Sequence, residues 1–347
     1  MIAETNLPNT NNATAATELS AIVVQLRTSR GFAHKRDIDD VISILGQSSM
    51  VGTNAVALGD DCAAIVDGDG FLLLAIEGFL NEFVASDPWF AGYCSVMVNV
   101  SDVYAMGGRP IAIVDAFWSR EGEAARPLLE GMAAASSVYG VPIVGGHSNR
   151  RNDREQLSVA ILGRAKNLLT SFDARPGESL IAAIDLRGSF HGPNAYWDAS
   201  SGQSPERLRA DLDLLPSIAE AGWCKAGKDI SMAGVVGTAL MLLECSAIGA
   251  TIALEAIPRP AGVPLQRWLT TFPSYGFLLS VPDAHVDDVL ACFHNRDLAA
   301  AVVGRTNASH VVSLQYQDEV EILWDFDQQN LIGCGPTSNN QHEAGHA

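Results

Sequence analysis

The segment from residue 88 to 108, PWFAGYCSVMVNVSDVYAMGG, constrains the fold of this chain more than any other. It begins with a proline, which suits the first turn of a helix, and ends with two glycines, which suit a helix C-terminus. The sequence therefore predicts a helix that is almost wholly apolar, with Asn99 and Asp102 on one face. Because burying an unpaired carboxylate costs several kcal/mol, Asp102 needs a partner.

A second local pattern precedes this helix. The segments CAAIV and FLLLAIEG flank the turn DGDG, and the two Asp-Gly dipeptides predict a β-hairpin. Counting outward from Gly68 and Asp69 places Asp60 and Asp61 opposite Ile76 and Glu77. Three carboxylates are therefore expected at one end of the hairpin.

Strands and helices alternate twice along the chain. The first round contains an amphipathic helix at 34–46, the hairpin, the apolar helix, strands near 111–117, 141–147 and 157–163, and a helix at 124–140. The second begins at a linker near 171–178, contains helices at 205–222 and from Asp229, and ends in a hairpin at 312–324. This pattern predicts a mixed α/β or α+β fold, with a disordered lead at 1–17, an N-terminal domain at 18–166, a C-terminal domain at 167–332 and a flexible tail at 333–347.

Composition narrows the class of partner. The formal net charge of −18 argues against nucleic-acid binding, although carboxylates can bind a nucleotide through Mg²⁺. Residues 232–250 are long and apolar enough to be considered as a membrane span, but their glycine and alanine content and the strand that follows favour a buried helix. Six scattered cysteines form no C-x-x-C pair. We expect a cytoplasmic protein with no membrane or nucleic-acid partner and with cysteines buried as small apolar residues.

The common phosphate-binding loops, G-x-x-x-x-G-K-[ST] and G-x-G-x-x-G, do not occur. The candidates that remain are GDD at 59–61, the glycine turn GGHS at 145–148, and Asp229, which can equally be a helix N-cap. HEAGH at 342–346 matches the zinc-protease pattern, but its place in the last six residues favours a chance match. Carboxylates and an exposed glycine turn together are the parts that a Mg²⁺-nucleotide site needs.

Five segments in collinear order carry a resemblance to a known family. GDDCAAIV, NVSDVYAMGGRP, VGGHS, KDISMAG and PSYGFLLSVP resemble the aminoimidazole ribotide (AIR) synthetase, or PurM-like, superfamily over roughly residues 35–305. This superfamily includes selenophosphate synthetase, whose motifs are the most similar, and thiamine-monophosphate kinase. The resemblance implies an N-terminal α/β domain whose sheet pairs with a second subunit into a β-barrel, a C-terminal α/β domain, and ATP between them.

The resemblance also implies roles for single residues. The expected Mg²⁺ ligands are Asp61, Asp102 and Asp229. Lys35 aligns with a mobile lysine that reaches the phosphates, and together with the preceding His34 it is a candidate catalytic residue. Contacts with ATP are expected from Asp60, Glu77, Asn99, Gly145, Gly146, His147 and Ser148.

Departures from the family patterns limit the reaction. Phe32 stands three residues before Lys35, where selenophosphate synthetase has cysteine or selenocysteine, so selenophosphate synthesis is not expected. AIEG and PSYGFLL stand where thiamine-monophosphate kinase has T-T-D and G-G-E-D-Y-E-L.

The sequence therefore predicts an AIR synthase-related homodimeric enzyme, a phosphotransferase or cyclo-ligase, that uses Mg²⁺ and ATP to phosphorylate or activate an oxygen of a small metabolite. The alternatives are an activity like that of thiamine-monophosphate kinase or selenophosphate synthetase, and a non-catalytic ATP-binding sensor or assembly protein.

Overall fold

The computed structural model describes residues 17–45, 56–120 and 125–334. The predicted lead up to residue 16, the predicted helix end at Gly46, the tail from residue 335 and HEAGH lie outside the described residues. Some residues of the predicted disordered lead and flexible tail make defined contacts. The Thr17 hydroxyl caps helix α1, and Gly333 and Cys334 are buried.

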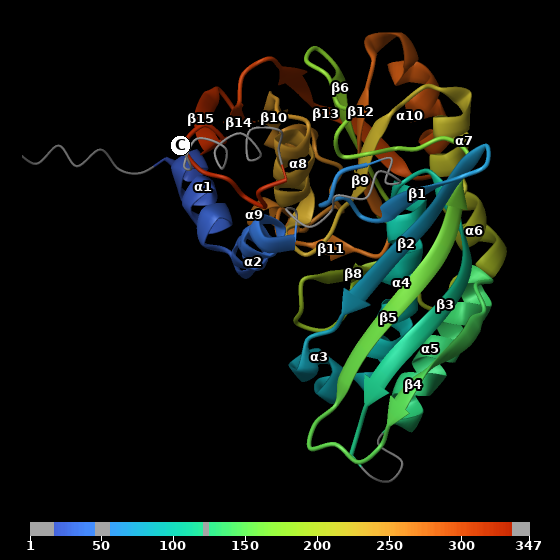
Figure 1. Cartoon of the computed structure of the whole chain (residues 1–347). Coiled ribbons are helices and arrows are strands. Elements are labelled where there is room, and N and C mark those ends of the chain that lie inside the picture. The colour runs from blue at the N-terminus through green and yellow to red at the C-terminus, as the bar shows by residue number, and fades with distance from the viewer. Residues whose placement is uncertain (1–16, 46–55, 121–124, 335–347) are drawn as a thin grey trace, which may run out of the picture.

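The first half is built on a five-stranded sheet with the strand order β1-β2-β5-β3-β4 (Figure 1). Its strands are β1 (Ala63–Asp67), β2 (Gly70–Gly78), β3 (Gly108–Trp118), β4 (Ile143–Asn149) and β5 (Gln156–Ala165). Strands β1 and β2 form the predicted hairpin, and the pairs Asp67 with Gly70 and Ala63 with Leu74 confirm the predicted register. Extending that register places Asp60 and Asp61, just before β1, at the end of the hairpin that carries Glu77.

Three helices cover one face of this sheet: α3 (Asn81–Ser86), α4 (Pro88–Ala105) and α5 (Arg126–Tyr139). Helix α4 is the predicted apolar helix. It begins at Pro88, where the Asp87 side chain accepts a hydrogen bond from Phe90 N, and it ends before Gly107, whose φ of +74° suits glycine. Helices α4 and α5 pack so closely that a Cβ on Gly92 would overlap a carbonyl oxygen of α5.

The second half is built on a seven-stranded sheet with the order β15-β14-β10-β13-β6-β12-β9. Its strands are β6 (Ser179–Ile184), β9 (Ala226–Asp229), β10 (Gly249–Ala253), β12 (Gly276–Val281), β13 (Ala299–Asn307), β14 (Val311–Tyr316) and β15 (Glu319–Asp325). A small sheet adds β7 (Ser189–Phe190), β8 (Tyr196–Asp198) and β11 (Phe272–Pro273). The remaining helices are α1 (Glu18–Thr28), α2 (Arg30–Leu45), α6 (Pro205–Leu212), α7 (Leu214–Ala221), α8 (Gly234–Cys245), α9 (Leu265–Trp268) and α10 (Val286–His294), with single 3₁₀ turns at η2 (Leu254–Ala256) and η3 (Asp283–His285).

Two hydrophobic cores hold these layers together. One joins α4, α5 and the first sheet to α7, α10 and one face of β6 and β12, so the two halves share a core. The other joins α8 to the opposite face of the second sheet and includes apolar residues of α1 and Phe32 of α2. The segment 18–45, which the sequence assigned to the N-terminal domain, therefore packs on the C-terminal half.

Several predicted elements have different boundaries in the structure. The predicted helix at 205–222 is two helices, α6 and α7, separated at Asp213. Asp229 is not a helix N-cap, because it is the last residue of β9 and α8 begins only at Gly234. The predicted glycine turn at 145–148 is wrong, since these residues continue β4 alongside β3.

The apolar segment 232–250 contains α8, every residue of which is buried, as predicted. No described helix has both the length and the apolar character that a membrane crossing requires. All six cysteines are described and free; five are buried and Cys292 is partly buried.

Candidate functional site

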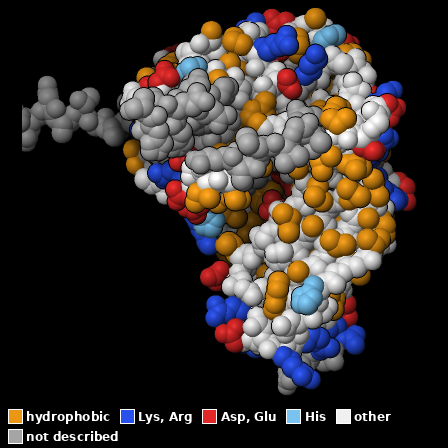
Figure 2. Space-filling model, in the orientation of Figure 1, with side chains coloured by type: hydrophobic (Ala, Val, Ile, Leu, Met, Phe, Trp, Pro, Cys, Tyr) orange, Lys and Arg blue, Asp and Glu red, His pale blue; other side chains and the backbone are white. Residues whose placement is uncertain are grey.

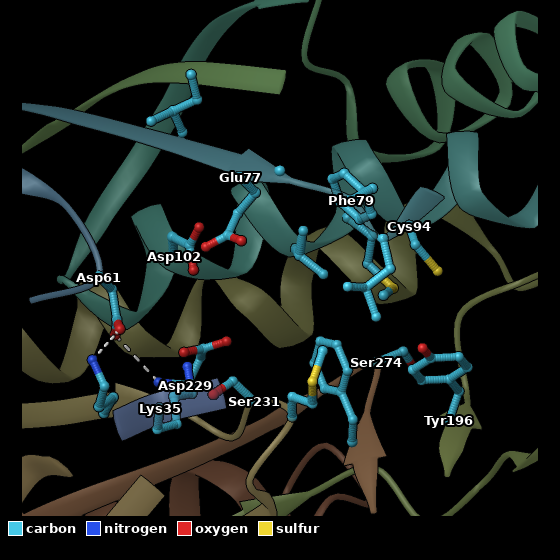
Figure 3. Close-up of a pocket in the computed structure, with 18 of the residues that line it drawn as sticks. Lys35, Asp61, Glu77, Phe79, Cys94, Asp102, Tyr196, Asp229, Ser231 and Ser274 are labelled. Carbon is cyan, nitrogen blue, oxygen red and sulfur yellow. Dashed lines mark hydrogen bonds and ion pairs between the residues drawn. The ribbon is translucent and has the colours of Figure 1, made fainter. Parts of the chain in front are cut away.

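Three carboxylates from three separate elements meet in a cavity between the two halves (Figure 3). Asp61 lies before β1, Asp102 lies near the end of α4, and Asp229 ends β9. One carboxylate oxygen of each lies within 4.8 Å of those of the other two. All three were predicted as metal ligands, and the fold brings them together from widely separated positions in the chain.

The position of each carboxylate has a local cause. The DGDG turn and the register of β1 with β2 set Asp61 at the hairpin end. Helix α4 carries Asp102 on its buried face. The pairing of β9 with β12 sets Asp229 opposite Phe277, and its backbone N–H donates to Asp61 Oδ2 at 3.4 Å.

Asp60 and Lys228 form a second layer behind these carboxylates. The side chain of Asp60 is fully buried and accepts hydrogen bonds from Ser171 N at 2.8 Å and Ser171 Oγ at 2.6 Å. The Lys228 ammonium is buried, forms an ion pair with Asp61, and lies 3.9 Å from Asp60 Oδ1. These contacts anchor the Asp60-Asp61 loop to the second half of the molecule.

Burial and mutual repulsion disfavour the charged forms of these acids. Burial raises the pKa of Asp229 to about 7, with Asp61 adding to the rise, and the pKa of Asp60 to about 6. The pKa of Asp102 is raised well above its ordinary value, by burial first and then by Glu77, Asp229 and Asp61. The ammonium group of Lys228 lowers the pKa of each of these carboxyl groups, but by less than burial raises it.

Glu77 and Lys35 complete the polar end of the cavity. Glu77 keeps access to solvent through the cavity, but the surrounding walls desolvate its carboxylate and raise its pKa. Lys35, on α2, lines the same cavity, and its positive charge opposes the rise in the pKa of Glu77 and of Asp229. Figure 3 shows Lys35 on the side of the carboxylates.

The donor set fits a hard divalent cation. Asp102 Oδ2 is buried and finds no hydrogen-bond partner among the described residues. An orphaned carboxylate oxygen beside two further carboxylates is costly in the metal-free protein, whereas oxygen ligands of this kind are those that Mg²⁺ prefers. Asp61, Asp102 and Asp229 are therefore suited to hold Mg²⁺.

Other predicted site residues lie elsewhere. His34 Nε2 is 3.3 Å from Arg30 Nε, from which it accepts a hydrogen bond, and His34 does not line the cavity. Asn99 is fully buried within α4, where its Nδ2 donates to Ser95 O at 2.8 Å. The catalytic role of His34 and the contact of Asn99 with ATP stay predictions.

The predicted glycine segment also lies outside the cavity. Gly145, Gly146, His147 and Ser148 are exposed on edge strand β4, three strands from β2 and so roughly 14 Å from Glu77. Their contact with ATP stays a prediction.

Sequence reasoning missed Lys228 and Ser171. Lys228 stands next to Asp229 in a short strand whose four residues are all buried. A lysine is almost never buried without a charged partner, so a lysine directly before a candidate metal ligand was a usable signal. Ser171 carries no such signal, because a serine near a linker is typical of any exposed loop.

The cavity continues beyond the carboxylates. Its volume is about 330 Å³, and away from the acidic end its wall is mostly apolar. Figure 3 shows Phe79, Cys94 and Tyr196 at the end opposite the carboxylates.

Comparisons with known proteins match both halves of the chain. Residues 59–165 match the family model described as AIR synthase related protein, N-terminal domain, and residues 186–317 match its C-terminal domain. An uncharacterized protein of Synechocystis is 49% identical over 91% of this chain and 98% of its own length. One from Methanocaldococcus jannaschii is 32% identical over 91% of this chain and 99% of its own. The selenide, water dikinase of Myxococcus xanthus is 26% identical over 70% of this chain and 72% of its own.

Solved structures agree on the fold. Phosphoribosylformylglycinamidine synthase subunit PurL of T. maritima, complexed with ATP, gives a TM-score of 0.67 at 19% identity, covering 88% of this chain and 50% of PurL. The structure described as AaThiL complexed with AMPPCP and TMP gives 0.62 at 21% identity, covering 80% of this chain and 94% of that one. This chain therefore spans half of PurL and nearly all of AaThiL.

Proposed function

This chain belongs to the AIR synthase related protein family, and on that premise we propose that it is an enzyme that uses Mg²⁺ and ATP to phosphorylate an oxygen of a small metabolite. The family and the mixed α/β fold predicted from the sequence are confirmed by these matches. The reaction is our proposal.

One observation carries it: the carboxylates of Asp61, Asp102 and Asp229 converge within 4.8 Å at one end of the cavity. Three buried carboxylates with an orphaned oxygen cost stability, and burial raises the pKa of two of them. Groups perturbed in this way and gathered in a cavity are typical of functional sites.

Each side chain has a task in this proposal. Bound Mg²⁺ would neutralise charge on the transferring phosphoryl group. Asp61, Asp102 and Asp229 would hold the ion, while Lys228 keeps Asp61 oriented toward the cavity. Lys35 would donate hydrogen bonds to phosphate oxygens from the cavity wall. The apolar wall would keep water from competing with the metabolite oxygen.

The relatives support the same class of chemistry. One is a selenide, water dikinase, and the structural neighbours were solved with ATP or with AMPPCP and TMP. Phe32 argues against the selenide reaction here. Its ring is 1% exposed and packs 6.4 Å from that of Trp324, so this position serves the core.

The test is ATP turnover by the full-length protein with a metabolite library, followed by ³¹P NMR of the product. We expect one acceptor to produce ADP and a phosphorylated oxygen with Mg²⁺ and nothing in EDTA. Asp102→Asn should lose this activity, whereas Asp67→Asn, at an exposed hairpin position, should keep it. Mg²⁺-ATP binding without turnover on any acceptor would favour the non-catalytic sensor instead.

We also propose that the chain is a homodimer joined through the open face of the first sheet. Helices cover the other face, whereas Figure 2 shows apolar side chains spread over this one. Leu74 pairs with Leu162, and Ile76 lies in one row with Ala160 and Val114. Four of these residues are large and exposed: Leu74, Ile76, Val114 and Leu162. Such a continuous apolar surface is typical of a surface that a partner covers.

Light scattering should therefore give twice the mass of one chain at micromolar concentration. Leu74→Glu should produce monomers, and Val24→Glu, at a still more exposed apolar position on α1, should leave the dimer intact. A monomeric wild-type protein would contradict this assembly.

A further inference from the structure

The cavity has two chemically different ends. The carboxylates and Lys35 lie at one end, and aromatic and sulfur-containing side chains from α3, α4, β8, β11 and the loop after β2 line the other (Figure 3). We call six of these lining residues the aromatic end: Phe79, Phe83, Phe90, Met97, Tyr196 and Phe272. The metal ligands account for the acidic end only.

The rings of the aromatic end hold one another in place. The Phe83 and Tyr196 ring centroids are 5.3 Å apart, and Tyr196 meets Phe272 at 6.1 Å with the ring planes 72° apart. Phe83 also meets Phe90 at 6.1 Å and 77°. Because edge and tilted contacts of this kind are favourable, the rings support one another's orientation without a ligand. A wall of rings favours a flat guest that can stack or insert edge-on.

Polar groups at this end are already engaged within the protein. Asp198 Oδ1 accepts hydrogen bonds from Ser200 N and Ser201 N, both at 2.9 Å. Ser274 Oγ accepts from Ala199 N at 2.9 Å. Because Asp198 already places a carboxylate at this end, an anionic ligand group would lose its hydration and meet a like charge, which costs several kcal/mol. The aromatic end therefore disfavours an anionic group.

Size sets a further limit. An apolar cavity of roughly 150 Å³ holds one benzene-sized ring. The whole cavity is about 330 Å³, so one ring leaves room for a short polar arm that reaches the carboxylates.

We propose that the phosphoryl acceptor is a small molecule with an aromatic ring that carries no negative charge and, on a short arm, the oxygen that receives the phosphoryl group. The ring occupies the aromatic end, and the arm carries the oxygen toward the acidic end. This inference rests on the proposed function for the role of the oxygen, but the binding of the ring does not depend on it.

The experiment uses 2-phenylethanol as the probe, with glycerol as the comparison that has the hydroxyl groups but no ring. Saturation-transfer NMR on the full-length protein should show binding of 2-phenylethanol, with a dissociation constant below that of glycerol. Equal or tighter binding of glycerol would overturn the aromatic assignment.

Two variants locate the binding. Phe83→Gln, at a half-buried position on α3, should weaken 2-phenylethanol binding by roughly two- to tenfold, the value of one aromatic contact. Phe326→Gln, at a half-buried position outside the cavity, should leave it unchanged. Equal binding by wild type and Phe83→Gln would overturn the proposal.

A third variant separates this inference from the proposed function. Asp102→Asn should lose the stabilisation by Mg²⁺-ATP but retain 2-phenylethanol binding, and Phe83→Gln should show the reverse. If Mg²⁺-ATP stabilises none of the proteins while the probe binds as expected, the proposed function fails and the aromatic site stands.

Discussion

Replacing Asp102 by asparagine should stabilise the metal-free protein and abolish its response to Mg²⁺. The magnitude follows from the geometry of the cluster. Two unit charges 4.8 Å apart repel by about 3.5 kcal/mol at an effective dielectric constant of about 20. The rise in the pKa of Asp229 from 3.8 to about 7 corresponds to about 4 kcal/mol, but burial is its first cause, so repulsion between carboxylates is only part of it.

The effect depends on pH with a definite sign. Because the folded state raises the pKa of these carboxyl groups, it binds protons more readily than the unfolded state does. The folded protein therefore loses stability as the pH rises from about 4, the unfolded value, through about 7, the pKa of folded Asp229. The variant should match the wild type near pH 4 and exceed its free energy of unfolding by roughly 2–4 kcal/mol near pH 8, since about one pairwise repulsion is removed.

The assay is thermal unfolding at both pH values, in EDTA and in Mg²⁺. A gain of this size raises the melting temperature by several degrees, since 1 kcal/mol is worth about 2–4 °C in chains of 150–250 residues. The wild type should gain stability on adding Mg²⁺, and the variant should not.

Asp211→Asn is the matched control, because Asp211 is buried and ion-paired with Arg187 and Arg296. Losing a buried ion-pair partner should cost about 3–5 kcal/mol and leave the response to Mg²⁺ unchanged. If Asp102→Asn behaves like this control, Asp102 belongs to the scaffold and the reasoning about the site is refuted.

Three further predictions concern the site and its support. Lys35→Met should lower ATP turnover by roughly 10²-fold while leaving the melting temperature nearly unchanged; normal turnover would remove Lys35 from the site. Glu244→Ala should lower the free energy of unfolding in urea by roughly 3 kcal/mol or more, because the Glu244 carboxylate accepts hydrogen bonds from the backbone N–H groups of 331–333, and a loss below about 1 kcal/mol would contradict this. Gly92→Ala should lower the free energy of unfolding by roughly 1–3 kcal/mol, because the added methyl group forces α4 away from α5. Gly145→Ala should cause no such loss, because the added Cβ would lie 4.0 Å from its nearest neighbouring atom. Equal melting temperatures of the two variants would refute the close packing of α4 and α5.

Features set by local pattern could be predicted from the sequence. The DGDG turn and its flanking strands determined the register that sets Asp61 beside Glu77, because a hairpin register depends only on turn geometry and the period of two. The ends of α4 could also be predicted, because proline suits the first turn of a helix and glycine suits the position after its last turn, as Pro88 and Gly107 do here. The convergence of Asp61, Asp102 and Asp229 was expected only through the family resemblance, since spacing alone does not place three distant segments together.

Local pattern also misled. Asp229 precedes a long apolar segment and so looked like an N-cap, but pairing with β12 extends it into β9. GGHS looked like a turn because of its glycines, but pairing with β3 extends β4 through it. In both cases hydrogen bonds to a distant strand overrode the local preference.

The sequence by itself determined the kinds of element, their order and the acids available for a metal site, because hydrophobic period and turn chemistry act within a few residues. Only the tertiary structure decided which side chains complete the site. Lys228 pairs with Asp61 across 167 positions of the chain, and Phe83 meets Tyr196 across the boundary between the halves. Such contacts depend on how helices and sheets dock, which is set by how side chains pack in the two hydrophobic cores and not by any local period. The sequence therefore predicted the residues of the acidic end of the cavity, and it did not predict those of the aromatic end.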